Sequence, residues 1–386
     1  MQLSSAAKHS DNPSDYPSGN LGDNPSDYSS VPVVLQLINA RAQRKRIGMG
    51  ILLLLLLTCA YVGLTRGSLP IDIEQQLRYF ISGANTVENT AANTTHWYVL
   101  SEIRLPRVIM TMLIGALLAV SGCAMQGLVR NPLADPGLIG IAGGAAAAAA
   151  LSMTIVPPLL PALESVWVAM WAFGGALVSV WTVLRFSNGP QGVSVAALIL
   201  AGVAINALTG TVIGAISYVA SDDALRQISY WTMGSLAGAS WTLCGLVALA
   251  SFIAITGLMK SGNALNLMAL GEKEAAYMGL NVTRYKQRVL WLVAFSVALA
   301  TALCGIIGFV GLVVPHMCRA IFGVNHQVLI PASALMGALL LMVADTLART
   351  LFVPMEIPIG IVTSAVGAPF FLYLLWQQRR IFSGGV

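Results

Sequence analysis

The chain has 386 residues, of which 56% are apolar and only 10% are charged. A soluble globular domain usually carries about 25% charged residues, so this composition excludes an ordinary water-facing surface. A membrane-spanning helix needs about 20 predominantly apolar residues, and such runs fill almost the whole chain after residue 46. The formal charge of +5 comes largely from short segments between these runs, which is typical of membrane topology and not of nucleic-acid binding. The sequence therefore predicts an all-α, polytopic membrane helix bundle.

Residues 1–46 differ from the rest of the chain. They are rich in Ser, Pro, Asn, Asp and Gly, and the hexapeptide at 11–16 recurs at 23–28. Such a composition buries too little apolar surface to offset the entropy of ordering, so we predict a disordered cytoplasmic tail. Basic residues at 41–46 then precede the apolar run Ile51–Leu57, as in a signal peptide. No small-residue cleavage site follows and many more spans do, so we expect an uncleaved first helix.

The remaining domain, 47–386, is predicted to cross the membrane about ten times. The predicted crossings are 47–66, 104–128, 137–156, 165–185, 193–216, 241–260, 286–308, 313–323, 328–352 and 357–376. Gly305–Pro315 interrupts one apolar run, so segment 313–323 is expected either to cross or to re-enter. With both termini in the cytoplasm, fifteen Lys and Arg residues lie inside and six outside, which favours this orientation.

Small residues are dense within the predicted spans. Examples are the segment Gly140–Gly144, the alanine run that follows it, and the pair Gly115 and Ala119. Lipid gives no hydrophobic drive for helix association, so close backbone approach has to replace it. We therefore expect tightly packed helices.

The sequence lacks a catalytic constellation. There is no glycine-rich phosphate loop, and the four histidines are not spaced with Cys, Asp or Glu as a metal site. The five cysteines are scattered within apolar runs, which predicts small, reduced, buried side chains. We expect no enzyme activity, no metal and no cofactor in this chain.

Ionisable groups near the outer ends of the predicted spans are more informative, because charge is costly in lipid. Asp345 and Arg349 lie four residues apart, where a helical ion pair forms easily, and Arg104 and Arg107 flank Pro106. Two interpretations remain open. The groups are a self-satisfied pair with two interface anchors, or the arginines form a positive outer rim that meets an acidic partner.

The inner face carries a segment that is too short and too charged to span. Met268–Leu280 is amphipathic at helical spacing. Its apolar positions are Leu270, Ala275, Met278 and Gly279, and its charged positions are Glu272, Lys273 and Glu274. The segment is expected either to lie on lipid or to dock into a cytoplasmic partner.

At these residues, over about 50–378, the chain resembles the permease subunits of ATP-binding-cassette (ABC) importers for iron chelates, heme and cobalamin. The motifs that carry the resemblance are Arg104-Leu-Pro-Arg107, Met125-Gln-Gly127, Arg130-Asn-Pro-Leu-Ala-Asp-Pro-Gly137, Leu270-Gly-Glu272, Gly308-Phe-Val-Gly-Leu-Val-Val-Pro-His316, Ala344-Asp-Thr-Leu-Ala-Arg349 and Ile357-Pro-Ile-Gly360. The resemblance implies the type II importer architecture in a bacterial inner membrane. It further implies a homodimer with a central pathway, cytoplasmic ATPase subunits and a periplasmic substrate-binding protein.

The same resemblance assigns roles to residues. Arg104, Arg107 and Arg349 would receive acidic residues of the binding protein. Segment 266–284 would couple to the ATPase through Leu270, Gly271, Glu272, Glu274 and Gly279. Asn131 and Leu133 would form an inner gate, and Ser194 and Val195 a second one, although Val195 and Ala196 replace small hydroxyl residues expected there.

Alternatives remain open for the substrate of the transporter and for the class of membrane protein. The motifs are most similar to the heme branch, with a ferric siderophore or cobalamin as the other candidates. His316 is either a heme ligand or a structural residue of its motif. An ion-coupled carrier and a purely structural scaffold are the competing classes. A carrier usually places ionisable relays in mid-membrane, whereas the ionisable residues here cluster at span ends.

Overall fold

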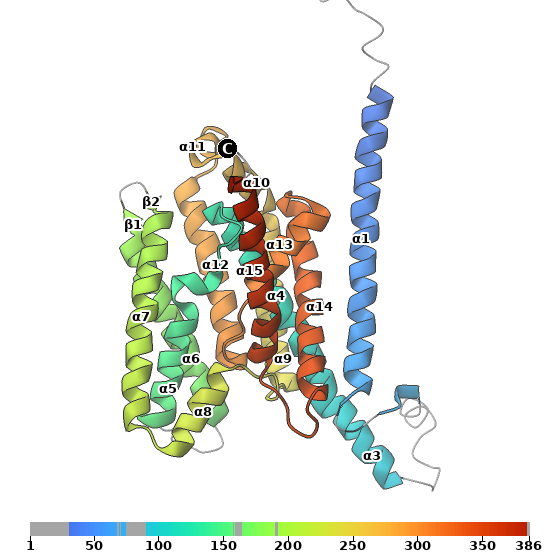
Figure 1. Ribbon diagram of the computed structural model, residues 1–386, viewed down its shortest axis with the longest axis vertical. Helices are drawn as coiled ribbons and strands as arrows, with labels where there is room; N and C mark the ends of the chain where they lie inside the picture. The colour runs from blue at the N-terminus through green and yellow to red at the C-terminus, as the bar shows by residue number, and fades with distance from the viewer. Residues whose placement is uncertain are drawn as a thin grey trace, which may run out of the picture. The chain divides into compact units, whose positions relative to one another are not determined.

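The computed structural model describes residues 31–67, 69, 71–74, 90–156, 158, 164–189 and 192–383. Contacts within the chain divide it into two units, Met1–Ile47 and Gly48–Val386. The second unit contains the helical bundle (Figure 1). Its described elements are α-helical except for two helical turns of other pitch and one short β-ladder.

The elements follow one another in this order. They are α1 (Val31–Thr65), α3 (Thr90–Tyr98), the π-helix η2 (Val99–Arg104), α4 (Leu105–Val129), the 3₁₀ turn η3 (Pro136–Ile139), α5 (Ile141–Thr154), α6 (Glu164–Ser187), β1 (Asn188–Gly189), β2 (Gly192–Val193), α7 (Val195–Val219), α8 (Asp222–Thr232), α9 (Trp241–Lys260), α10 (Gly262–Leu270), α11 (Glu272–Tyr277), α12 (Val282–Cys304), α13 (Val310–Phe322), α14 (His326–Thr350) and α15 (Ile359–Ser383). Strands β1 and β2 are antiparallel, with Asn188 opposite Val193 and Gly189 opposite Gly192.

In the part of the chain that the structure describes, a helix coincides with each of the ten predicted crossings. Within the described residues, eight helices are long and apolar enough to span a membrane, and Ile141–Thr154 and Val310–Phe322 are shorter apolar helices. The predicted interruption after α12 is also present. Gly305 and Phe309 adopt left-handed φ angles of 71° and 66°, which end α12 and turn the chain into α13. The all-α membrane bundle predicted from the sequence is confirmed.

The N-terminal segment differs in part from its prediction. Residues 1–30 of the predicted disordered tail lie outside the described residues. Residues 31–46, also predicted to be disordered, are helical because α1 begins at Val31. The physical reason lies in the sequence after Pro32, which contains Leu, Gln, Ala and Arg and no further Pro or Gly before Gly48.

Several short helices were not predicted. Helix α8 has Asp222 and Asp223 in its first turn, and the Ser221 side chain accepts a hydrogen bond from Ala224 N at 3.3 Å. Such a polar, capped start is typical of a helix N-terminus. The sequence signal was present but lay in a segment too polar to count as a crossing.

Helix α4 forms the centre of the bundle. Most of its residues are buried, and it packs against α14, α9, α12 and α13 (Figure 1). Its glycines permit this. A Cβ on Gly115 would collide with the carbonyl group of Gly337 on α14, and a Cβ on Gly122 would collide with the backbone of Gly311 on α13. The tight packing predicted from the small residues is confirmed.

A substitution pair tests this packing. Gly122→Ala should lower the melting temperature, because the added methyl group overlaps backbone that cannot move away, at a cost of about 1–3 kcal/mol. Gly245→Ala on α9 is the matched control, since a Cβ there meets no heavy atom within 4 Å. Thermal unfolding of both variants in the same detergent measures the difference. Equal melting temperatures would contradict the close approach of α4 and α13.

Candidate functional site

At one end of the bundle, Asp345 on α14 holds two arginines. Arg107 on α4 donates from Nε to Asp345 Oδ1 at 3.0 Å, and its Nη2 lies 2.9 Å from the same oxygen. Arg349, one turn after Asp345, donates from Nε to Oδ2 at 3.0 Å. Asp345 has 0% exposure, so both of its oxygens are shielded from water and depend on these arginines. The predicted Asp345–Arg349 pair is confirmed.

The other donors of Arg107 and Arg349, together with Arg104, bind carbonyl groups near the end of α1 and the carboxylate of Glu356. Arg349 Nη2 donates to Gly63 O at 3.1 Å, and Arg104 Nη1 donates to Leu64 O at 2.7 Å. Arg104 also donates to the carbonyl of Leu69. Arg107 Nη1 lies 2.9 Å from Glu356 Oε2, and the Glu356 side chain is 47% exposed.

The predicted exposed rim of arginines is therefore wrong in its exposure. Arg104, Arg107 and Arg349 are buried and hydrogen-bonded within the chain. The reason is that Asp345 and the carbonyl groups at the end of α1 accept their hydrogen bonds. Among the ion pairs that the three arginines form within the described residues, the Arg107–Glu356 pair is the one whose carboxylate is exposed.

The predicted coupling segment lies at the opposite end, together with the turn that joins α6 and α7 (Figure 1). Helix α11 is bracketed by Gly271 with φ 141° and Gly279 with φ 87°. Both angles lie in the region where a side chain is strained, and a Cβ on Gly271 would also collide with the Glu274 carboxylate. These two glycines set the direction of α11.

The amphipathic face predicted for this segment is not a single face. Ala275 is buried, whereas Leu270 and Met278 are exposed, as is Tyr277 at 88%. The turn at Gly271 separates α10 from α11, so a continuous helical spacing does not apply across it. The result is a group of exposed apolar side chains beside Glu272 and Glu274.

Lys286 connects this segment to the α6–α7 turn. Its ammonium group lies 2.5 Å from Glu272 Oε1 on α11 and donates to Val193 O on β2 at 3.1 Å. Lys286 is buried in the second turn of α12, a helix long and apolar enough to span a membrane. Gly192 lies against the same helix, because a Cβ there would approach Thr283 Oγ1 to 2.9 Å. The first turns of α12 therefore bind the coupling segment on one side and the turn on the other.

The predicted gate residues lie in two turns near this end. Asn131 Oδ1 accepts from Leu133 N at 2.9 Å in the α4–α5 turn. Asp135, in the same turn, accepts from Gly137 N at 2.6 Å. Burial raises the pKa of the Asp135 carboxyl above its ordinary value, and the Gly137 hydrogen bond opposes that rise. These hydrogen bonds fix the shape of the turn.

The second predicted gate begins α7. Ser194 caps this helix, its Oγ accepting from Ala197 N at 3.4 Å, and Val195 packs against the main core. Since Val193 O is the acceptor for Lys286, the residue held by Lys286 directly precedes the cap of α7. Within the described residues, no hydrogen bond joins this turn to the Asn131 turn.

A polar group that sequence reasoning did not select lies between α4 and α13. Gln126 Oε1 accepts from Arg319 Nη1 at 2.5 Å, and its Nε2 donates to Leu312 O at 3.2 Å. The Met125-Gln-Gly127 motif was the available signal. His316 lies nearby in sequence and packs edge-on against Phe370 at 6.1 Å between ring centroids.

Comparison with known proteins identifies the family to which the chain belongs. The model of the FecCD transport family matches residues 53–377. The chain belongs to this family. Within it, the hemin transport system permease protein HmuU of Yersinia pestis is 44% identical over 90% of this chain and 100% of its own length. The vitamin B12 import system permease protein BtuC of Serratia proteamaculans is 41% identical over 72% of this chain and 82% of its own.

Two further similar proteins agree with this family assignment. A probable iron chelatin transport system permease protein of Helicobacter pylori is 37% identical over 73% of this chain and 84% of its own. A solved inward-facing structure of a metal-chelate type ABC transporter has a TM-score of 0.75 and 28% identity, covering 86% of this chain and 99% of that one.

These relatives are ABC transporter permeases, so this chain is a multi-pass transport subunit and not an enzyme. Membership of the family implies an ATPase and a substrate-binding protein as partners. It does not support the ion-coupled carrier.

Proposed function

We propose that this chain forms the membrane pathway of an importer for heme, as a homodimer in a bacterial inner membrane with both termini in the cytoplasm. The observation that supports heme as the substrate is the 44% identity to the hemin permease, which extends over that protein's whole length. The excess of positive residues on one side of the predicted topology supports the orientation. Cobalamin is the second candidate, because the vitamin B12 permease is 41% identical over 82% of its length.

The exposed face of α7 supports the homodimer, while the other face of this helix packs against α5 and α6. Only 11% of the most apolar stretch of α7 is buried, against 78% for Thr94–Val129. Gly210 and Gly214 lie one turn apart on α7, and a Cβ on either would meet no heavy atom within 4 Å. Small residues at this spacing permit close packing of membrane helices. A second copy of α7 would bury this surface.

The outer network supports a revised docking proposal. Arg107 binds the exposed Glu356, so a carboxylate of the binding protein would replace Glu356 on Arg107 instead of meeting a free arginine. Arg104 and Arg349 then act by holding α1 and Asp345 in place.

The inner contacts support a coupling proposal. The exposed Leu270, Tyr277 and Met278 offer an apolar surface to the ATPase, with Glu272 and Glu274 at its side. Movement of α11 would be transmitted through Lys286 to Val193 and hence to Ser194 and Val195 at the start of α7. Gly271 and Gly279 supply the turns that orient α11, and Asn131 and Leu133 form the separate turn of the first gate.

Reconstitution tests the substrate. The chain, its ATPase and its binding protein in liposomes should accumulate heme when ATP is supplied inside. Cobalamin and a ferric siderophore, each with its own loaded binding protein, are the parallel assays. ATP-dependent uptake of cobalamin without uptake of heme would overturn the substrate proposal while leaving the permease assignment intact.

Removing the Glu356 carboxylate, which would compete with the binding protein for Arg107, tests the docking proposal. Glu356→Gln should tighten binding-protein affinity by up to about fivefold, because an ion pair that solvent reaches through its Glu356 side contributes about 0.2–1 kcal/mol. Glu102→Gln is the matched control. It removes the same charge from an exposed residue of η2, the helical segment that directly precedes α4 and Arg107. Surface-binding measurements at two salt concentrations give both affinities. Equal affinities for the two variants would contradict the exchange on Arg107.

Replacing the ammonium group tests coupling. Lys286→Met should leave ATPase association intact but lower substrate transported per ATP about tenfold or more, because a charge-assisted hydrogen bond contributes about 1.5–3 kcal/mol. Lys286→Arg should restore part of the ratio, and Lys273→Met, an exposed neighbour on α11, should not change it. Parallel pull-down, ATPase and uptake assays separate the effects. A normal transport ratio in Lys286→Met would refute the proposal.

A further inference from the structure

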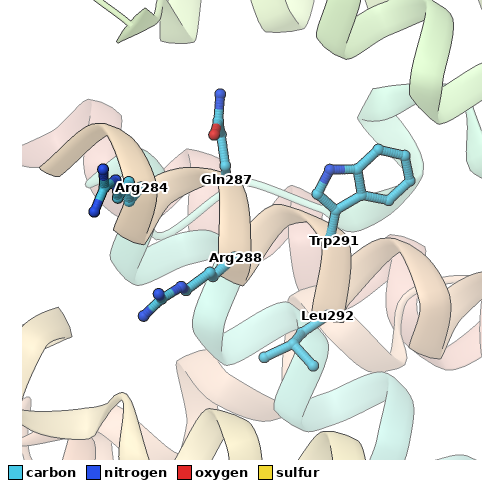
Figure 2. Close-up of a pocket in the computed structure, with 5 residues that line it drawn as sticks. All are labelled: Arg284, Gln287, Arg288, Trp291 and Leu292. Atoms are coloured by element: carbon cyan, nitrogen blue, oxygen red, sulfur yellow. The ribbon is translucent and has the colours of Figure 1, made fainter. Parts of the chain in front are cut away.

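The outward face of α12 carries a hollow that the transport proposal does not use. Its volume is about 580 Å³, and it is lined by Arg284, Gln287, Arg288, Trp291 and Leu292. Figure 2 shows these side chains projecting from one helix, with Gln287 and Trp291 on one side of the face and Arg288 and Leu292 on the other. Trp291 is 41% exposed although it lies on a membrane-spanning helix.

The neighbours of α12 define where this face points. Phe295 packs edge-on against Phe173 of α6 at 5.7 Å between ring centroids. Leu292 lies against Gly257 of α9, where a Cβ would approach it to 3.2 Å. The residues that line the hollow all belong to α12, and α6 and α9 pack against the same helix at Phe295 and Leu292. Inside the bundle, α12 packs against α4, which leaves this face directed outward.

The two arginines of this face lack partners. Within the described residues, neither Arg284 nor Arg288 has a side-chain hydrogen bond or an ion pair, in contrast to Lys286 between them. The sequence contains no Asp or Glu between Glu274 and Asp345, so α12 supplies no counter-charge of its own. Two unpaired cations at the level of a membrane interface attract a soluble or lipid anion.

The order of residues along the helix selects a lipid. Arg284 lies in the first helical turn, Arg288 in the next, and Trp291, Leu292 and Phe295 follow. With a rise of about 1.5 Å per residue, this sequence runs from charge to apolar surface over about 16 Å. A phospholipid has the same order, with its phosphate at the interface and its acyl chains beyond. The positive end of the α12 dipole adds to the attraction.

We propose that this hollow binds the phosphodiester headgroup of an anionic phospholipid. Arg284 and Arg288 donate to the phosphate oxygens, since a guanidinium group matches a phosphate with two parallel hydrogen bonds. Gln287 donates beside them, and Trp291 covers the glycerol region. The acyl chain then lies over Leu292 and Phe295 between α6 and α9. Because the site shares α12 with Lys286, the lipid would hold the helix that supports the coupling segment.

Lipid retention tests this site. The purified chain is placed in nanodiscs of phosphatidylcholine with or without about one fifth phosphatidylglycerol, and co-purified lipid is counted by native mass spectrometry. The wild-type chain should retain phosphatidylglycerol and melt at a higher temperature in its presence. The Arg284→Gln/Arg288→Gln variant should bind it about tenfold more weakly or worse, because it loses both charge-assisted contacts.

Three controls make the outcome decisive. Arg130→Gln/Arg185→Gln removes two other exposed arginines, and it should retain lipid as the wild type does. Melting in pure phosphatidylcholine should be the same for all three proteins, which shows that each one folds. Inorganic phosphate added to phosphatidylcholine nanodiscs should give no stabilisation.

Each contrary result has a distinct meaning. Equal lipid retention by both double variants would overturn the site. Stabilisation by inorganic phosphate alone would assign it to a soluble anion. A change of oligomeric state in Arg284→Gln/Arg288→Gln without a change in lipid retention would assign the face to a second protein copy. None of these outcomes bears on which substrate the importer carries.

Discussion

A charge enclosed by apolar helices needs a partner inside the chain, because solvent cannot stabilise it there. Asp345 meets this requirement with Arg107 and Arg349, which come from α4 and from its own helix α14. Removing one member of such a buried set leaves an uncompensated charge and costs about 3–5 kcal/mol. Since α4 is the helix around which the others pack, this network fixes the α4–α14 pair at the end of the bundle where Asp345 lies.

The same requirement shapes the opposite end of the bundle in a different way. Lys286 is buried at the start of α12, and its two partners belong to separate segments, α11 and β2. Because one ammonium group makes an ion pair to α11 and a hydrogen bond to β2, it couples the movement of these two segments more directly than apolar contact would. Between the two ends, α4 approaches α14 and α13 so closely that no methyl group fits. We therefore expect transport to involve movement of whole helices around a rigid centre.

Much of this architecture was predictable because its causes are local. Apolar run length gave the ten helices, Gly305 marked the break before α13, and the spacing of Asp345 and Arg349 gave their ion pair. Contacts between distant segments were not predictable. Arg107 is 238 residues from Asp345 in sequence, and Lys286 is 93 residues from Val193. A single sequence contains no signal for such pairings, so the arginines were expected to be exposed and Lys286 was counted only as a topology marker.

Local reasoning also failed where a glycine changed the chain direction. The spacing from Leu270 to Met278 predicted one amphipathic helix, but Gly271 adopts φ 141° and separates α10 from α11. The apolar residues of the segment were identified correctly, but the prediction that they share one helix face was wrong. The exposure of Tyr277 and Met278 next to the Lys286 contact is what connects this correction to coupling.

We expect α11 and the α6–α7 turn to respond as one unit to the ATPase, because Lys286 binds both. Hydrogen exchange read by mass spectrometry tests it directly, by comparing peptides that cover 270–278 and 188–198 with and without bound ATPase. We expect ATPase binding to slow exchange in both peptides of the wild-type chain, but only in 270–278 of Lys286→Met. An equal response of 188–198 in both proteins would rule out this coupling, because the turn would then sense the ATPase without Lys286.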